Sequence, residues 1–181
     1  MQAVKDYVKR IKRAVAEAEK DGRDPRDPKK SYHMFLLGNP GVGKTEVGMM
    51  IHKFLYSYGI VKKDTFQNVD GPSLKAPFVG QTSQNVEGIV GRAMGGTLFI
   101  DEAYAVGDSQ DKFAQEAIAK LLLTLENNRD NLVVVFAGYE DKMTEMGRIN
   151  SGLFSRVNEK IIMGDYTPAE LGDITEFMAS K

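Results

Sequence analysis

The chain has 181 residues, of which 42% are hydrophobic and 27% charged, and its formal net charge is -1. That length suits one well-filled domain, and the near-neutral charge argues against a protein that binds nucleic acid through bulk charge. The lack of cysteine excludes a disulfide, a thiolate metal site and a cysteine nucleophile. No apolar run approaches the roughly 20 residues that cross a bilayer, and the first residues lack the apolar segment of a signal peptide, so we expect a cytoplasmic protein without membrane contact.

Residues 1–31 are expected to form an N-terminal helix and a linker. Apolar residues recur at steps of three and four between residues 3 and 20, as on an amphipathic helix. Residues 21–31 contain two prolines and alternating charges, which is typical of a solvated linker. Residues 1–31 hold ten Lys or Arg and six Asp or Glu, a net +4 that leaves -5 for the rest. We interpret the basic helix face as solvated rather than as a surface for membrane or nucleic acid.

The rest of the chain alternates short apolar runs with helical periodicity. We expect strands at 32–37, 65–69, 97–100, 132–136 and 159–163, and helices at 44–58, 83–94 and 113–126. Continuous apolar runs such as LVVVF are typical of strands covered on both faces. The alternation predicts an α/β fold, a parallel five-stranded sheet with helices on both faces. Residues 32–165 would form this core, and Thr167 followed by Pro168 predicts the start of another helix in 166–181.

Residues 38–45, GNPGVGKT, match the P-loop pattern and lie between an expected strand and an expected helix. The glycines allow a tight backbone turn whose N–H groups surround phosphate oxygens, and the helix directs its positive end at the same anion. Lys44 would reach the β- and γ-phosphates of ATP, and the Thr45 hydroxyl would ligate Mg²⁺. The expected nucleotide-binding residues are Gly38, Asn39, Pro40, Gly41, Val42, Gly43, Lys44, Thr45 and Glu46.

A second motif is the apolar run TLFI followed by Asp101 and Glu102. Such a strand delivers both carboxylates to its carboxyl end, where α/β sheets bind ligands. Asp101 would hold Mg²⁺, and Glu102 would act as the general base for the attacking water. Together with the P-loop, this motif favours ATP hydrolysis.

Several longer stretches resemble one family. GNPGVGKT, FVGQT, MGGTLFIDEAYAV, QEAIAKLLLTLENNRDNLVVVFAGYEDKM and SGLFSRV resemble the AAA+ ATPases of the CbbX/CfxQ–SpoVK group, which includes red-type Rubisco activases. The resemblance runs from about residue 4 to the end. It implies the large subdomain of a P-loop AAA+ protein, an ATP-driven homo-oligomeric ring, generally a hexamer, that remodels or threads a protein client.

The resemblance also implies two residues around the phosphates. Arg156 falls at the position of the arginine finger, which would enter the neighbouring subunit's site and act in trans; Arg148 is a weaker candidate for that role. Tyr139 falls at the position that AAA+ proteins use to sense the γ-phosphate. For Tyr139 a packed aromatic remains the alternative.

The segment APFVGQT contains an aromatic between two residues that break regular structure. By itself it leaves open whether Phe78 is buried or exposed. The resemblance implies that Phe78, Val79 and Gly80 form a pore loop that grips the client. It also implies that residues 166–181 begin a helical lid that is mostly missing, so we expect low ATPase activity from this polypeptide alone.

Other P-loop functions fit this sequence less well. A GTPase is disfavoured because Asp101 is not followed by a D-x-x-G glycine and Asn127 to Asp130 lacks the guanine-reading lysine. A small-molecule kinase is disfavoured because the sequence shows no evident basic lid segment. A nucleotide-gated scaffold without turnover is the alternative that Glu102 and Arg156 argue against. The two histidines have no metal-binding pattern.

Overall fold

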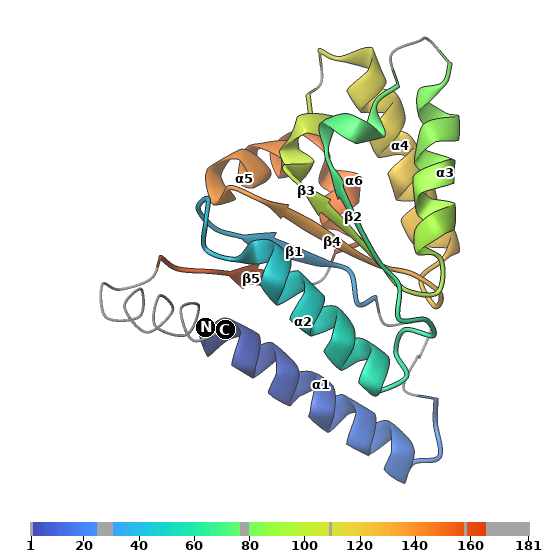
Figure 1. Cartoon of the computed structure of the whole chain (residues 1–181), viewed down its shortest axis with the longest axis vertical. Coiled ribbons are helices and arrows are strands. Elements are labelled where there is room, and N and C mark those ends of the chain that lie inside the picture. The colour runs from blue at the N-terminus through green and yellow to red at the C-terminus, as the bar shows by residue number, and fades with distance from the viewer. Residues whose placement is uncertain (1, 25–30, 77–79, 109, 158, 166–181) are drawn as a thin grey trace, which may run out of the picture.

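The fold is built on one sheet of five parallel strands, in the order β2-β3-β4-β1-β5 (Figure 1). The computed structural model describes residues 2–24, 31–76, 80–108, 110–157 and 159–165. The strands are β1 (Met34–Leu37), β2 (Phe66–Asp70), β3 (Thr97–Asp101), β4 (Val133–Gly138) and β5 (Glu159–Ile162). The predicted parallel five-stranded α/β fold is therefore confirmed.

One helix precedes the first strand, and others connect the strands. They are α1 (Gln2–Lys20), α2 (Lys44–Ser57), α3 (Thr82–Ala93), α4 (Lys112–Asn127), α5 (Glu140–Ile149) and α6 (Ser151–Phe154), with short 3₁₀ turns η1 (Pro72–Leu74) and η2 (Ala103–Val106). In the described segments no helix combines the length and the apolar character that a membrane span requires. The helix expected in 166–181 and part of the linker, 25–30, lie outside the described residues.

Alternate residues of the strands pack into two cores, one on each face of the sheet. On β1, Met34 and Leu36 belong to the core that α1 and α2 complete, whereas Phe35 and Leu37 belong to the core under α3 and α4. This follows from the two-residue period of a strand. Helices consequently cover both faces, with α1 and α2 on one and α3 and α4 on the other (Figure 1).

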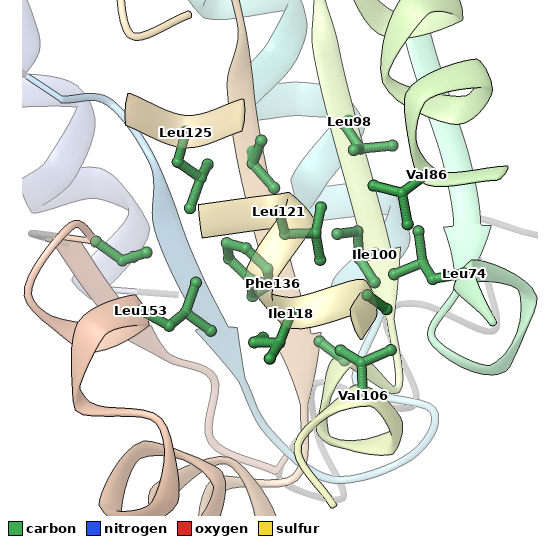
Figure 2. Close-up of a cluster of buried hydrophobic side chains, with 14 of the residues drawn as sticks. Leu74, Val86, Leu98, Ile100, Val106, Ile118, Leu121, Leu125, Phe136 and Leu153 are labelled. Atoms are coloured by element: carbon green, nitrogen blue, oxygen red, sulfur yellow. The ribbon is translucent and has the colours of Figure 1, made fainter. Parts of the chain in front are cut away.

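The core under α3 and α4 fixes the two strands that lead to the functional site (Figure 2). Leu98 and Ile100 of β3 and Phe136 of β4 have no exposed surface, and they pack with Leu121 of α4 and Val86 of α3. Burying a side chain of this size stabilises the fold by roughly 1.5–3 kcal/mol. The residues that follow β3 and β4 therefore extend from a rigid layer.

Candidate nucleotide-binding site

The loop between β1 and α2 is held tightly by its glycines. Gly41 and Gly43 have φ values of 75° and 77°, in the left-handed region that glycine adopts without strain. At Gly38 a Cβ would lie 2.8 Å from the carbonyl oxygen of Met163, just beyond β5. The loop thus turns sharply and lies against the end of the neighbouring strand, which only glycine permits.

Lys44 is the first residue of α2, and its ammonium group is held by the loop that precedes it. Nζ donates to the carbonyl oxygens of Gly38 at 2.9 Å and Asn39 at 2.8 Å. Gly43, at the N-cap of α2, provides no side chain to cap the first turn. A helix N-terminus and a lysine at one position together form a binding site for a phosphate group.

Two carboxylates lie at the carboxyl end of β3, at the same end of the sheet as the loop after β1. Asp101 is the last residue of β3, and its Oδ1 accepts a hydrogen bond from Glu102 N at 2.9 Å. Glu102 is exposed and has a left-handed backbone, with φ 49° and ψ 38°. The acid pair therefore turns away from the strand direction at the point where the chain leaves the sheet.

These segments surround one cavity of about 410 Å³ at the carboxyl ends of β1, β3 and β4. Its lining residues are Pro40, Gly41, Gly43, Lys44, Thr45, Glu46, Asp101, Glu102, Tyr104, Gly138 and Tyr139. The structure thus brings Lys44, Thr45, Asp101, Glu102 and Tyr139 together from three separate parts of the sequence. Ligands of α/β sheets bind at this edge.

Three of the expected nucleotide-binding residues do not line the cavity. Gly38 contributes its carbonyl oxygen to Lys44. Asn39 Nδ2 donates to both carboxylate oxygens of Asp165, at 2.9 and 3.0 Å. The Val42 side chain is 3% exposed and packs into the core beneath the loop.

Thr45 and Asp101 fit the requirements of Mg²⁺. The described residues contain no cluster of three or more His, Asp or Glu side chains that could hold a metal ion. Mg²⁺ bound with a nucleotide usually takes one or two protein ligands and completes its shell with phosphate oxygens and water. A hydroxyl and a carboxylate lining the same cavity as Lys44 match that ligand set.

One wall of the cavity is formed by two tyrosines, Tyr104 and Tyr139, of which only Tyr139 was predicted from the sequence. The rings of Tyr104 and Tyr139 lie 5.7 Å apart, and Lys142 Nζ lies 4.6 Å from the first ring centroid and 5.0 Å from the second. Burial, together with the nearby Glu102 carboxylate, raises the pKa of Tyr104 above its usual value. The position of Tyr104 two residues after Glu102 was the available signal.

Arg156 lies near the amino ends of the strands, whereas the cavity lies at their carboxyl ends. Its backbone oxygen accepts from Ser31 Oγ at 3.1 Å, just before β1 begins, and its Nε donates to Glu126 in the last turn of α4 at 3.1 Å. Hydrogen bonds from Arg129 and then Arg156 hold the pKa of Glu126 below its usual value. Arg148, the weaker candidate, is an exposed residue in the last turn of α5. The structure does not bring either arginine into this chain's own cavity.

Of the expected pore loop, Phe78 and Val79 lie outside the described residues. Gly80 is exposed and has a φ of 80°, as in a turn. The segments on either side are joined by a hydrogen bond from Ala76 N to Thr82 Oγ1 at 3.2 Å. The pore-loop interpretation stays a prediction.

Comparison with solved structures shows the same fold. The AAA domain of FIGL-1 in complex with ADP superposes with a TM-score of 0.57 at 23% sequence identity, over 81% of this chain and 47% of that one. At this identity the likeness concerns the fold alone.

Curated relatives are more similar in sequence. Protein CbxX (chromosomal) of Cupriavidus necator is 40% identical over 153 residues, covering 83% of this chain and 48% of the relative. The chloroplastic ribulose bisphosphate carboxylase/oxygenase activase of Cyanidioschyzon merolae is 41% identical over 151 residues, covering 82% and 52%. Protein CbbX of Cereibacter sphaeroides is 41% identical over 150 residues, covering 82% and 48%. The chain therefore spans about half the length of the curated relatives it matches.

A family model also matches most of the chain. Its description is "ATPase family associated with various cellular activities (AAA)", and it covers residues 34–165, from the start of β1 to just beyond β5. Together with the cavity described above and the relatives of about 40% identity, this match shows that the chain belongs to the AAA family of ATPases.

Proposed function

We propose that this chain binds ATP with Mg²⁺, hydrolyses the nucleotide and, as part of a homo-oligomeric ring, remodels or threads a protein client. One observation carries the proposal: Lys44, Thr45, Asp101 and Glu102 line a single cavity. A phosphate-binding lysine, two candidate ligands for a hard cation and a second carboxylate are the groups that nucleotide hydrolysis needs.

Each group has a distinct role. Lys44 binds the phosphates and leaves its resting hydrogen bonds to Gly38 and Asn39 as it does so. Thr45 and Asp101 hold Mg²⁺, which when bound offsets the negative charge on the phosphates. Glu102 accepts the proton of the attacking water as the general base.

The ring assembly rests on Arg156, and the protein client rests on the name of one relative. Arg156 lies at the end of the strands opposite to the cavity of its own chain. It therefore serves a nucleotide site only if another subunit presents that site to it. We propose a hexamer in which Arg156 acts in trans. One relative is named as an activase of an enzyme, ribulose bisphosphate carboxylase/oxygenase, which supports a protein as the client.

The proposal includes the organisation inferred from sequence. Residues 1–31 precede the nucleotide-binding core of 32–165, and 166–181 begin a helical lid. Phe78, Val79 and Gly80 grip the client in the central pore. The protein acts in the cytoplasm, without nucleic acid or membrane as a partner.

The test is Glu102→Gln in the full-length protein. The variant should lose ATP hydrolysis by 100-fold or more, on the order of a general base's contribution, while ATP affinity is kept. It should also retain its client longer, which a pull-down measures. Glu145→Gln, the same change at an exposed glutamate of α5, is the matched control. Unchanged hydrolysis in Glu102→Gln would contradict the proposal and favour a scaffold that binds nucleotide without turnover.

A further inference from the structure

The backbone of Glu102 is strained in a way that its own sequence does not explain. Among the described residues, Glu102 is the one non-glycine residue with a positive φ. Side-chain-bearing residues adopt this conformation rarely, and it persists only where the surrounding structure enforces it. Something outside the acid pair must therefore hold the two peptides that flank Glu102.

Gly71, at the end of β2, contacts both of those peptides. Its N–H donates to the carbonyl oxygen of Asp101 at 2.7 Å, which fixes the peptide before Glu102. A Cβ at position 71 would lie 2.4 Å from the carbonyl oxygen of Glu102 and 3.1 Å from its carbonyl carbon, so Gly71 also lies directly against the peptide after Glu102.

The glycine is required by this contact and not by its own backbone. Gly71 has φ -55° and ψ -47°, which any residue adopts. The space for a side chain is what is missing, since Ala105 Cβ would also be 3.2 Å from the added carbon. Gly71 is therefore a close-approach glycine facing the strained acid.

We propose that Gly71 is a positioning residue that holds the Glu102 carboxylate in the cavity for catalysis. The inference rests on the proposed function, because Glu102 is the general base there. With the peptides on both sides of Glu102 fixed from one point, the direction of its Cα–Cβ bond is fixed as well.

An added methyl group at position 71 would press against the carbonyl group of Glu102. The Gly71 side is anchored: β2 pairs with β3 up to Asp70, Asp70 Oδ1 accepts from Ser73 N at 3.1 Å, and Leu74 is fully buried. The Glu102 carbonyl oxygen accepts from Ala105 N at 2.9 Å, whereas the Glu102 side chain is exposed and borders the cavity. The shift therefore moves the carboxylate, and a misplacement of about 1 Å at a reacting group can cost on the order of 100-fold in rate.

The test compares ATP hydrolysis and nucleotide affinity in variants of the full-length protein. Gly71→Ala should lower kcat by about 10- to 100-fold, with KM and the nucleotide Kd changed by less than about threefold, because the contact acts on the general base and not on binding. Gly91→Ala in α3, where an added Cβ meets no atom within 4 Å, is the matched control and should keep the wild-type kcat.

A second pair of variants, at Asp70, weakens the anchoring of Gly71 without adding atoms to it. Asp70→Ala removes the acceptor for Ser73 N and should lower kcat by about threefold or more, whereas Asp70→Asn keeps an acceptor oxygen and should retain most of the activity. If Gly71→Ala does not fold, as judged by its thermal midpoint, this pair decides the question. Equal kcat values for Asp70→Ala and Asp70→Asn would then overturn the inference.

The double variant Gly71→Ala with Glu102→Gln separates positioning from a general structural effect. Because Gly71 acts through Glu102, the double variant should be no slower than Glu102→Gln alone. A further loss of kcat would overturn the inference. If Glu102→Gln itself has wild-type kcat, the proposed function fails; if Glu102→Gln is slow while the folded Gly71→Ala variant is not, only the inference about Gly71 fails.

Discussion

Arg156 Nε donates to Glu126 Oε2 at 3.1 Å, at the end of the strands opposite to the cavity that Lys44 lines. The guanidinium also donates from Nη1 to the carbonyl oxygen of Gly152 at 2.8 Å. In the single chain, Arg156 is thus held at the surface by short-range contacts. A catalytic role for it requires a second subunit.

The first prediction concerns this role. In the assembled full-length protein, Arg156→Ala should lower kcat by about 10³- to 10⁵-fold, the range measured for arginine fingers, with nucleotide affinity unchanged. Its thermal midpoint should hardly move, because exposed ion pairs contribute little to stability. Arg148→Ala tests the weaker candidate for the same role, and if Arg156 is the finger, the kcat of Arg148→Ala should stay within about threefold of wild type.

Mixed rings test the action in trans directly. Arg156→Ala subunits keep an intact cavity, and Lys44→Ala subunits keep the arginine. Co-assembly of two inactive variants should therefore restore part of the hydrolysis. Mixtures that form rings but stay inactive would contradict a role in the neighbouring subunit.

The second prediction concerns Tyr139, whose ring lies 5.7 Å from Lys44 Nζ and 5.0 Å from Lys142 Nζ. We expect the ring, and not the hydroxyl, to matter. Tyr139→Phe should keep the nucleotide Kd, whereas Tyr139→Ala should raise it about two- to fivefold, the value of one cation–π contact of 0.5–1 kcal/mol. Isothermal titration with an ATP analogue that is not hydrolysed measures both. If Tyr139→Phe loses hydrolysis as fully as Tyr139→Ala, the hydroxyl contacts the phosphate or the attacking water.

The sequence predicted the parts of the site that consist of local motifs. The loop from Gly38 to Thr45 and the pair Asp101–Glu102 were recognisable because tight turns and strand ends are encoded by adjacent residues. The same holds for the apolar strands β3 and β4, whose continuous hydrophobic runs predicted burial on both faces.

Contacts between distant segments could not be predicted in this way. Nothing in the order of residues indicates that Gly71 lies 2.7 Å from the carbonyl oxygen of Asp101, or that Lys142 covers the rings of Tyr104 and Tyr139. Helix α5 was also missed. It buries only Met143 and Met146, so its apolar periodicity is weak, and Glu140 and Asp141 in its first turn were the remaining signal.

The third prediction concerns the packing of α2 on the sheet. A Cβ at Gly48 would lie 2.5 Å from Cε2 of Phe99, a fully buried ring. Helix propensity favours alanine over glycine by about 1 kcal/mol, but overpacking a core costs about 1–3 kcal/mol. Because the clash is severe, Gly48→Ala should lower the free energy of unfolding, as measured by urea denaturation. Gly91→Ala meets no atom within 4 Å and should raise it by up to about 1 kcal/mol. A stabilised Gly48→Ala would show that α2 is not held against Phe99.

The fourth prediction concerns pH and His33. The side chain is 1% exposed, precedes β1, and accepts a hydrogen bond at Nδ1 from Val134 N at 3.1 Å. Burial, with a smaller effect from the charge of Arg129, lowers the pKa of His33 to about 4. In the unfolded chain the pKa is the ordinary 6.5 or so. The native state therefore prefers the neutral ring.

Between these two pKa values the unfolded chain binds more protons than the native one, so stability rises with pH across this window. The contribution is fully present above about pH 6.5 and is lost as the pH falls towards 4, a change of about 3 kcal/mol at 1.36 kcal/mol per pKa unit. In His33→Gln the amide oxygen can still accept from Val134 N but nothing titrates there. The free energy of unfolding from urea denaturation, measured from pH 4 to 7, should fall less steeply for His33→Gln than for wild type. His52→Gln keeps His33 and should retain the steeper fall. Parallel curves for wild type and His33→Gln would show that His33 titrates alike in the folded and unfolded chain.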